Sequence, residues 1–344
     1  MEMISPTKIK RAPVIGITIG NVSGIGPEIV LKSLAKMTDE QFKPVIIGDL
    51  RFLEETNEKF ATNLRFDRFD PHESEKSGSI SVVDLNNIKE KIEIGNESGL
   101  AGKASGEYIE KAVAMWSDGQ LDAIATAPIS KRSLAMGGYD FPGHTEFLAA
   151  LTNTERFAMS FFAEQLRVVL LSTHVSLSRA IELVTAERLI ELIQFTDASL
   201  SKLLGRKIRI AVAGINPHAS ENGMFGSEEA EIMEPAIAES VRRGIDVSGP
   251  CSPDTIFLRG FKGEFDAVVA CYHDQATIAV KSLSFGSAVN VTLGLPLIRT
   301  SVDHGTAFDI AGKGVADESS MCAAIRLAAR LAAGARGALL TDEV

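Results

Sequence analysis

The sequence has few cysteines and no excess of positive charge. Its three cysteines, Cys251, Cys271 and Cys322, have no Cys-x-x-Cys spacing. They are too few for a disulfide framework, so a reducing cytoplasm is the expected compartment. The 35 Lys and Arg residues stand against 45 Asp and Glu, giving a net charge of −10. No basic run is available to neutralise a phosphate backbone, so nucleic acid is not an expected partner.

Long apolar runs are also missing. No uninterrupted apolar segment is long enough to span a bilayer, and the first residues, MEMISPTKIKRAP, lack the apolar core of a signal peptide. We therefore expect neither a membrane nor export. Apolar residues make up 45% and charged residues 23% of the chain, as in a soluble protein with a sizeable core. At about 150 residues per domain, 344 residues suit two α/β lobes.

Short β-branched runs alternate with segments of helical period, which is typical of parallel α/β proteins. Apolar residues at helical spacing predict a helix over 186–204, and further helices are expected over about 27–37 and 321–335. The chain is predicted to cross between lobes near 127–131, giving a first lobe of 1–130 plus 306–344 and a second of 131–305. Strands are expected at 14–19, 44–47, 80–83, 123–126, 168–171, 208–213, 267–270 and 289–292.

A glycine turn, Gly20–Glu28, follows the first predicted strand and leads into a helix. The free N–H groups of such a helix start suit an anion. However, the dinucleotide fingerprint GxGxxG fails because Ile29 stands where a small residue is required, and the Gly-Lys-Ser/Thr of a phosphate-binding loop is missing. A tight turn without a ligand explains the pattern equally well.

Histidine placement is more informative. His174, His218 and His273 each lie a few residues beyond the carboxyl end of a predicted strand, the edge at which open α/β sheets bind ligands. Three imidazoles from separate loops can hold a divalent metal, with zinc expected first and magnesium, cobalt or manganese as alternatives. A single histidine of this kind is more often an ordinary loop or core residue. His72, in a charged stretch, is predicted to be a surface residue.

Polar residues near these histidines extend the candidate site. Asp274 is suited to orient the His273 ring, to accept a proton or to cap a helix. Lys281, Asn290 and Arg299 would donate to a carboxylate or phosphate, although each is also typical of a solvated surface.

Two further loops contain histidine. His144 and Thr145 begin a predicted helix, with Thr145 expected as its cap. The loop Asp303-His304-Gly305 is suited to the adenosine half of a nucleotide, or merely turns the chain.

Several blocks together resemble the 4-hydroxythreonine-4-phosphate dehydrogenase family of pyridoxal phosphate biosynthesis. They run in order from about Val14 to Leu327: Gly24-Ile25-Gly26-Pro27-Glu28, Gly143-His144-Thr145-Glu146-Phe147, Ser172-Thr173-His174, Asn216-Pro217-His218-Ala219, Tyr272-His273-Asp274-Gln275, Asn290-Val291-Thr292-Leu293-Gly294-Leu295-Pro296 and Ile298-Arg299-Thr300-Ser301-Val302-Asp303-His304-Gly305-Thr306-Ala307. The resemblance implies a fold like isocitrate and isopropylmalate dehydrogenases, with two α/β/α lobes around a central cleft.

The same resemblance implies a homodimer whose metal site is shared across the interface. His174, His218 and His273 match the metal ligands. The residues that match the substrate contacts are His144, Thr145, Lys281, Asn290 and Arg299, and the loop 303–305 matches a nucleotide-binding loop.

The implied reaction is NAD- or NADP-linked oxidation of 4-phosphooxy-L-threonine at its C3 hydroxyl, followed by decarboxylation, with Asp274 or Lys281 as the proton acceptor. Relatives acting on 4-phospho-D-threonate or 4-phospho-D-erythronate are an alternative. A phosphate acyltransferase on the same fold and a non-catalytic binding protein are alternatives of other classes. The chain departs from the family pattern at Asn21-Val22-Ser23, where Asp-Pro-Ala is usual, and at Ala276, where Gly is usual.

Overall fold

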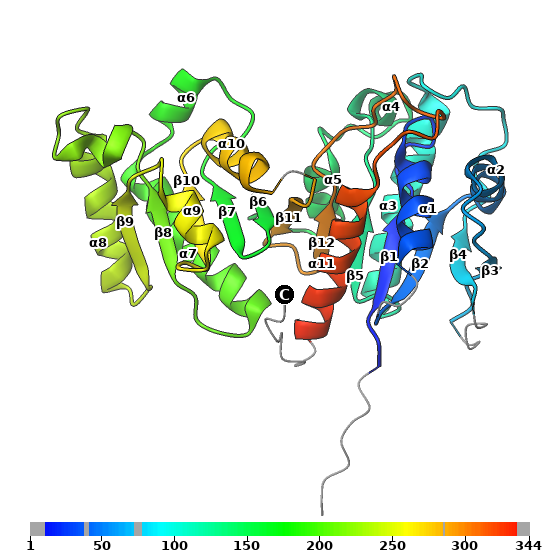
Figure 1. Cartoon of the computed structure of the whole chain (residues 1–344), viewed down its shortest axis with the longest axis horizontal. Coiled ribbons are helices and arrows are strands. Elements are labelled where there is room, and N and C mark those ends of the chain that lie inside the picture. The colour runs from blue at the N-terminus through cyan, green and yellow to red at the C-terminus, as the bar shows by residue number, and fades with distance from the viewer. Residues whose placement is uncertain (1–10, 38–40, 72–77, 285, 336–344) are drawn as a thin grey trace, which may run out of the picture.

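The computed structural model describes residues 11–37, 41–71, 78–284 and 286–335. His72, predicted to be a surface residue, lies outside these ranges. Within them the strands form a single 12-stranded sheet in the order β3-β4-β2-β1-β5-β12-β11-β6-β7-β10-β8-β9 (Figure 1). The strands are β1 Val14–Thr18, β2 Lys43–Gly48, β3 Phe66–Arg68, β4 Ile80–Asp84, β5 Ala123–Thr126, β6 Ala158–Ala163, β7 Leu166–Leu170, β8 Ile210–Ala213, β9 Val247–Cys251, β10 Ala267–Ala270, β11 Val289–Leu293 and β12 Ile298–Ser301.

Two parallel groups of strands are joined by antiparallel pairs. Strands β3, β4, β2, β1, β5 and β12 run parallel to one another, and so do β7, β10, β8 and β9. Between the groups, β11 pairs antiparallel with both β12 and β6, and β6 pairs antiparallel with β7. All eight predicted strands are present, and β3, β6, β9 and β12 are additional.

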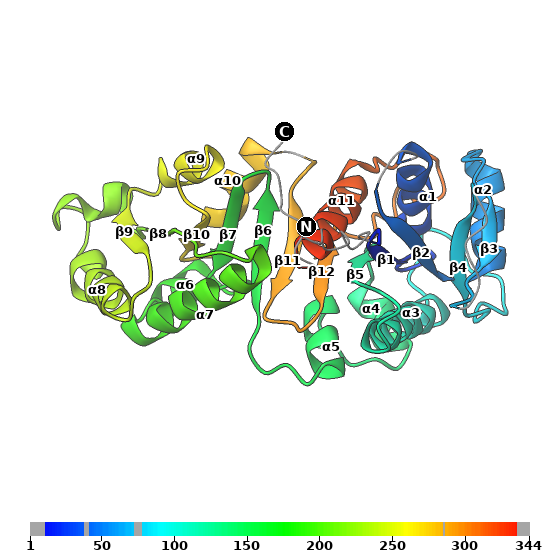
Figure 2. The same cartoon turned by 90° about the horizontal axis from the view of Figure 1, so that it is seen from below.

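Helices cover both faces of the sheet. Figure 2 shows α1 opposite α3 on the first group of strands, and α7 and α8 opposite α9 and α10 on the second. The predicted helices are confirmed as α1, α7 and α11. The helices are α1 Gly26–Lys36, α2 Leu50–Phe60, α3 Gly99–Ser117, α4 Lys131–Met136, α5 His144–Leu151, α6 Leu177–Glu182, α7 Ala186–Leu204, α8 Glu234–Arg242, α9 Ile256–Phe261, α10 His273–Leu283 and α11 Ser319–Ala335, with short 3-10 and π turns at Pro217–Glu221 and Glu229–Met233.

The buried apolar side chains form separate cores on the two groups of strands. One core draws on residues between 14 and 148 together with residues between 297 and 332. Two others lie on opposite faces of the second group, with α7 and α8 on one and α9 and α10 on the other. Helix α11 contacts strands β1, β5, β11 and β12 and helix α7, so it packs against both groups. The lobe boundaries given above remain a prediction.

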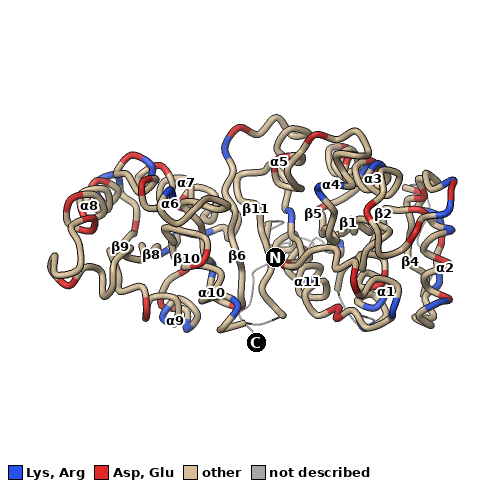
Figure 3. Tube along the Cα trace, turned by 90° about the horizontal axis from the view of Figure 1, so that it is seen from above, with Lys and Arg blue, Asp and Glu red and all other residues tan. Residues whose placement is uncertain are grey.

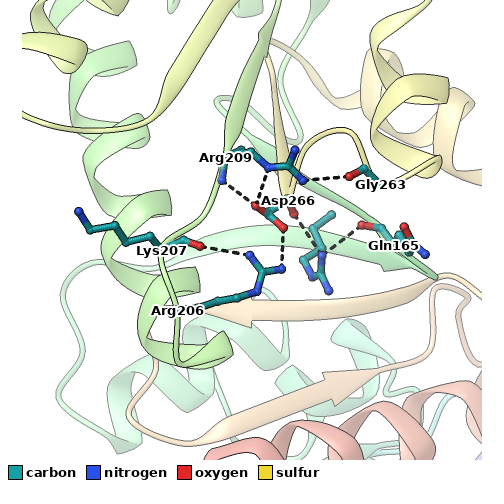
Figure 4. Close-up of polar contacts among 7 residues, drawn as sticks. Gln165, Arg206, Lys207, Arg209, Gly263 and Asp266 are labelled. Atoms are coloured by element: carbon teal, nitrogen blue, oxygen red, sulfur yellow. Dashed lines mark hydrogen bonds and ion pairs between the residues drawn. The ribbon is translucent and has the colours of Figure 1, made fainter. Parts of the chain in front are cut away.

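A buried carboxylate, Asp266, connects the end of α7 with the starts of β8 and β10. It lies at the sheet edge opposite the one at which His218 follows β8 and His273 follows β10. Asp266 accepts hydrogen bonds from Arg206 Nη2 and from the backbone N–H of Arg209, both at 2.7 Å (Figure 4). Arg209 also donates to the carbonyl of Gly263 at 3.1 Å. Burial raises the pKa of Asp266, but these hydrogen bonds and the two guanidinium charges outweigh it, so the pKa lies below its usual value.

Positions with Lys or Arg and positions with Asp or Glu are interspersed along the outer helices such as α2 and α7 (Figure 3). Among the described helices, none is both long and apolar enough to cross a membrane.

Candidate active site

A cavity of about 1010 Å³ brings together most of the predicted site residues. Most of its lining comes from the loops after β5, β7 and β12, from strands β6, β11 and β12, from helices α7 and α10, and from the start of α5. Every candidate residue named from the sequence lines this cavity except His218 and Asp274. The lining candidates are His144, Thr145, His174, His273, Lys281, Asn290, Arg299, Asp303, His304 and Gly305.

Arg299 is the buried cation of this cavity. Its side chain on β12 is 3% exposed, and it donates to two hydroxyls: Nε and Nη2 to Thr126 Oγ1 at 3.2 and 2.9 Å, and Nη1 to Thr292 Oγ1 at 3.1 Å. Among the described residues, no carboxylate forms an ion pair with it. Burial lowers the pKa of Arg299 to about 9, and the nearby Glu146 carboxylate acts in the opposite direction. The guanidinium is therefore charged at neutral pH and has no ion-pair partner among the described residues, as suits a site for an anion.

His144, in its neutral form, lies close to the Arg299 guanidinium. Burial, and secondarily the charge of Arg299, lowers the pKa of His144 well below its usual value. The residue as a whole is half-buried, but its Nε2 is fully covered and has no hydrogen-bond partner in the described part of the chain. The neighbouring Thr145 was expected to cap α5, and this is wrong. The N-cap residue is Gly143, with no side-chain cap, and Thr145 Oγ1 instead lies 3.4 Å from Thr292 Oγ1.

Asn290 and Lys281 provide further polar groups. Asn290 on β11 is half-buried, and its Oδ1 is covered and has no partner among the residues described. Lys281 lies in the last turn of α10 and is exposed at the cavity. An amide, an ammonium and a guanidinium thus line one cavity, a set of donors that suits carboxylate and phosphate groups.

His174 and His273 lie close together, with ring centroids 5.5 Å apart. They follow the neighbouring parallel strands β7 and β10. Asp274 Oδ1 lies 2.7 Å from His273 Nδ1, so the carboxylate fixes the ring and leaves Nε2 as the free nitrogen, an arrangement common among metal-binding histidines. This contact is compatible with the ring-orienting role considered for Asp274. It does not cap α10, which begins after Tyr272 without a side-chain cap.

His218 lies apart from this pair. It is outside the cavity lining, its side chain is 59% exposed, and its Nδ1 is 3.8 Å from Asp254 Oδ2. Within the described part of one chain, no group of three His, Cys, Asp or Glu side chains is arranged to hold a metal. A single copy therefore brings together two of the three predicted ligands.

Thr306, directly after the loop 303–305, packs against the glycine turn. The backbone N–H of Ile25 donates to the carbonyl of Thr306 at 3.0 Å, and a Cβ at Gly24 would meet that carbonyl at 2.7 Å. This bond uses a turn donor that an anion would need, which favours the tight-turn interpretation. Asn21, which stands where Asp is usual in the family, is fully buried. Its Oδ1 accepts hydrogen bonds from Ser23 N and Oγ at 3.0 and 2.6 Å, and the residue does not line the cavity.

Comparison with known proteins identifies the family of this chain. Residues 40–328 match the family described as pyridoxal phosphate biosynthetic protein PdxA. The chain belongs to the PdxA family. D-threonate 4-phosphate dehydrogenase from Cupriavidus necator is 47% identical over 324 residues, covering 93% of this chain and 97% of the relative.

Solved structures of the family show the same fold. A 4-hydroxythreonine-4-phosphate dehydrogenase from Klebsiella pneumoniae superposes with a TM-score of 0.85 at 40% identity, covering 93% of this chain and 100% of that one. One from Burkholderia phymatum gives 0.82 at 45% identity, covering 94% and 99%. These relatives are named dehydrogenases, so this PdxA-family chain is an oxidoreductase, and the predicted α/β fold and family are confirmed.

The cavity of this PdxA-family protein also contains charged residues that sequence reasoning missed. Glu146 follows His144 and Thr145 in the first turn of α5, while Arg188 and Glu191 project from α7. Arg188 Nη2 lies 3.4 Å from the carbonyl of Leu171, just before the His174 loop. The α7 residues belong to the polar face of an amphipathic helix, so their pattern indicates only a solvated surface.

Proposed function

We propose that this protein oxidises the C3 hydroxyl of D-threonate 4-phosphate with NAD or NADP to a ketone, and that the C1 carboxylate, now β to this ketone, then leaves as carbon dioxide. The inference of an anionic substrate depends mainly on Arg299, a buried cation with no carboxylate partner among the described residues. A phosphorylated hydroxy acid brings two anionic groups, and Lys281 and Arg299 supply two cations at the same cavity. The relative from Cupriavidus necator supports D-threonate 4-phosphate as the first choice.

A divalent metal, with zinc the first choice, fits the imidazole pair of His174 and His273. Two imidazoles with a carboxylate behind one ring form part of a common zinc-binding set. When bound, such a metal supplies Lewis acidity to the substrate hydroxyl and later to the developing negative charge. His144, Thr145 and Asn290 would orient the substrate beside it.

We assign the third ligand to His218 of a second copy in a homodimer. His218 is exposed and outside the cavity of its own chain. Apolar side chains are also exposed just beyond His174, namely Val175 at 46%, Leu177 at 59% and Ile181 at 43%. Exposed apolar groups next to an incomplete polar site favour burial against another chain.

Lys281 is the better candidate for accepting the hydroxyl proton. Asp274 already contacts His273 Nδ1 and lies outside the cavity lining, whereas Lys281 lines it.

The nicotinamide cofactor is assigned to the loop Asp303-His304-Gly305. This loop lines the same cavity, and its His304 Nε2 is covered and has no partner in the described ranges. The protein would act in the cytoplasm, on a soluble substrate.

4-Phosphooxy-L-threonine is the second candidate substrate. It has an ammonium at C2, where D-threonate 4-phosphate has a hydroxyl. The Glu146 carboxylate lines the cavity, is close enough to raise the pKa of Arg299, and could pair with that ammonium. The solved relatives named for 4-hydroxythreonine-4-phosphate, at 40% and 45% identity, support the same choice. Both candidate substrates would bind in the same cavity and undergo the same reaction.

The deciding test offers both substrates, with 4-phospho-D-erythronate as a third, to metal-reconstituted protein and follows NADH or NADPH formation. We expect D-threonate 4-phosphate to give the highest kcat/KM and a chelator to abolish turnover. Preference for the amino acid would replace the first candidate by the second. Turnover that survives chelation would overturn the metal assignment, and acyl transfer to phosphate without any nicotinamide reaction would overturn the oxidoreductase assignment itself.

A further inference from the structure

The backbone that carries His218 is held in an unusual conformation. Five consecutive residues, 218–222, have φ between 46° and 64°, the left-handed region that L-amino acids with a side chain rarely adopt. None of the five is glycine. Such a run persists only where its surroundings determine it, because each residue would relax to the right-handed region if released.

The surroundings here centre on a single buried carboxylate. Glu229 is 1% exposed, and its Oε1 accepts from the backbone N–H groups of Ile215 and Asn216 at 2.9 and 2.7 Å. Its Oε2 accepts from Asn216 Nδ2 at 2.8 Å. In the described part of the chain, no Lys or Arg forms an ion pair with Glu229. The carboxylate is therefore stabilised by the three N–H groups that lead into the left-handed turn.

Close packing leaves this turn little room to relax. A Cβ at Gly214 would lie 3.0 Å from Ala219 and 3.2 Å from Glu229 Oε1. A Cβ at Gly226 would lie 2.5 Å from Asn216 Nδ2. The glycines on both sides of the turn thus allow the backbone to approach the Glu229 and Asn216 side chains.

The same network reaches the other two histidine loops. Gln275, two residues after His273, donates through Nε2 to the carbonyl of Gly214 at 2.7 Å and accepts from Cys271 N at 2.8 Å. Ser172, two residues before His174, donates to the carbonyl of Cys271 at 3.0 Å. The three loops that follow β7, β10 and β8 are therefore linked by hydrogen bonds close to their histidines.

We propose that Glu229 is a positioning residue that holds the left-handed turn 218–222 so that His218 is presented for metal binding. The proposal rests on the proposed function, in which His218 is a metal ligand. Glu229 does not touch substrate, cofactor or metal in this scheme. It acts through the backbone of residues 215 and 216.

The test is a Co²⁺ titration of purified protein, followed by visible absorption and without any turnover. Glu229→Gln keeps the size of the side chain but turns one acceptor oxygen into a donor facing Asn216 Nδ2. We expect its Co²⁺ affinity to fall about tenfold, the lower end of the range for residues that orient metal ligands. Glu231→Gln, an exposed change in the same short π turn, is the matched control and should leave the affinity unchanged.

A second substitution that restores Co²⁺ affinity distinguishes a positioning role of Glu229 from general destabilisation of the protein. Glycine adopts left-handed φ without cost, so Ala219→Gly added to Glu229→Gln should restore a large part of the Co²⁺ affinity. Absence of rescue, or an affinity of Glu229→Gln within twofold of the unmodified protein, would overturn the proposal. If Glu229→Gln does not fold, Asn216→Ala takes its place, because it removes the side-chain donor and leaves the backbone in place. An unchanged Co²⁺ affinity in Asn216→Ala would likewise count against the proposal.

His218→Ala separates this proposal from the one on which it rests. A loss of Co²⁺ binding in His218→Ala together with unaffected binding in Glu229→Gln rejects the positioning role alone. Unaffected binding in His218→Ala rejects His218 as a ligand, and the positioning role fails with it.

Discussion

Arg299 on β12 donates two hydrogen bonds to the hydroxyl of Thr126 on the neighbouring strand β5, from Nε at 3.2 Å and from Nη2 at 2.9 Å. A third bond goes from Nη1 to Thr292 Oγ1 at 3.1 Å. All three bonds go to neutral acceptors, so the guanidinium is oriented while no carboxylate in the described ranges forms an ion pair with it. This is a cation fixed in advance for an incoming anion.

Replacing Arg299 by Met is expected to separate function from stability. The change removes the charged donor to the substrate, so kcat/KM should fall about 10²–10³-fold, in line with the loss of a buried charge-assisted contact. It also removes a buried charge that forms no ion pair within the described part of the chain, so the free energy of unfolding without substrate should change by less than about 1 kcal/mol. Steady-state kinetics and urea unfolding measure the two quantities. Arg242→Met, on the exposed side of α8, is the control and should preserve kcat/KM.

His144 is expected to make the stability of the protein fall on acidification. Its folded pKa lies well below its usual value of 6.5, so below pH 6.5 the unfolded chain binds a proton that the folded protein does not. Stability is then lost as the pH falls from the unfolded towards the folded pKa, by up to about 1.4 kcal/mol per pH unit. Urea unfolding with chelator at pH 7.5 and 5.5 should show a smaller loss for His144→Asn than for the unmodified protein. Equal losses would mean that His144 is protonated in the fold.

The sequence predicted the fold well wherever strands consist of buried β-branched residues. The additional strands lack that pattern for identifiable reasons. β3 has three residues, Phe66–Arg68, and β9 contains Gly249 and Pro250. β12, with the sequence IRTS, is a buried strand made largely of polar residues. Its hydrogen bonds to Thr126 and Ala324 satisfy these groups, and such long-range partners cannot be read from a local pattern.

The site was less fully predictable than the fold. Histidines beyond strand ends correctly indicated the sheet edge for His174 and His273, which follow neighbouring strands. His218 follows β8, on the other side of β10, yet its left-handed turn carries it away from the pair. Nothing in the local sequence predicts this, because the residues of the turn are not glycines and the buried carboxylate of Glu229 lies 11 residues further along the chain.

Asp274→Asn is expected to weaken metal binding without affecting the fold. The carboxylate holds His273 Nδ1 at 2.7 Å, and an amide would hold the ring less strongly and lower its basicity. Loss of such a carboxylate typically costs 10–100-fold in metal affinity. The Co²⁺ titration described above measures the affinity, and urea unfolding without metal should show a change below about 0.5 kcal/mol because the Asp274 side chain is exposed. Near-normal affinity and turnover would remove Asp274 from the site.

Asp266→Asn tests a purely structural carboxylate away from the cavity. In the folded protein, hydrogen bonds from Arg206 and Arg209 overcome the effect of burial and keep the pKa of Asp266 below its usual value of 3.8. Its ionised form therefore stabilises the fold above about pH 4. That contribution is lost as the pH falls through the still lower folded pKa.

At pH 7, Asp266→Asn should lower the free energy of unfolding by about 1–3 kcal/mol, a range reduced for solvent screening because both arginines are about half exposed. Below pH 4 the difference between the variant and the unmodified protein should shrink. Urea unfolding at pH 7, 5 and 3.5 measures it, with the exposed Asp246→Asn as control. A difference that stayed constant down to pH 3.5 would show that Asp266 acts through its shape and not its charge. In either case kcat/KM at pH 7 should be unchanged, because Asp266 precedes β10 at the edge opposite His273.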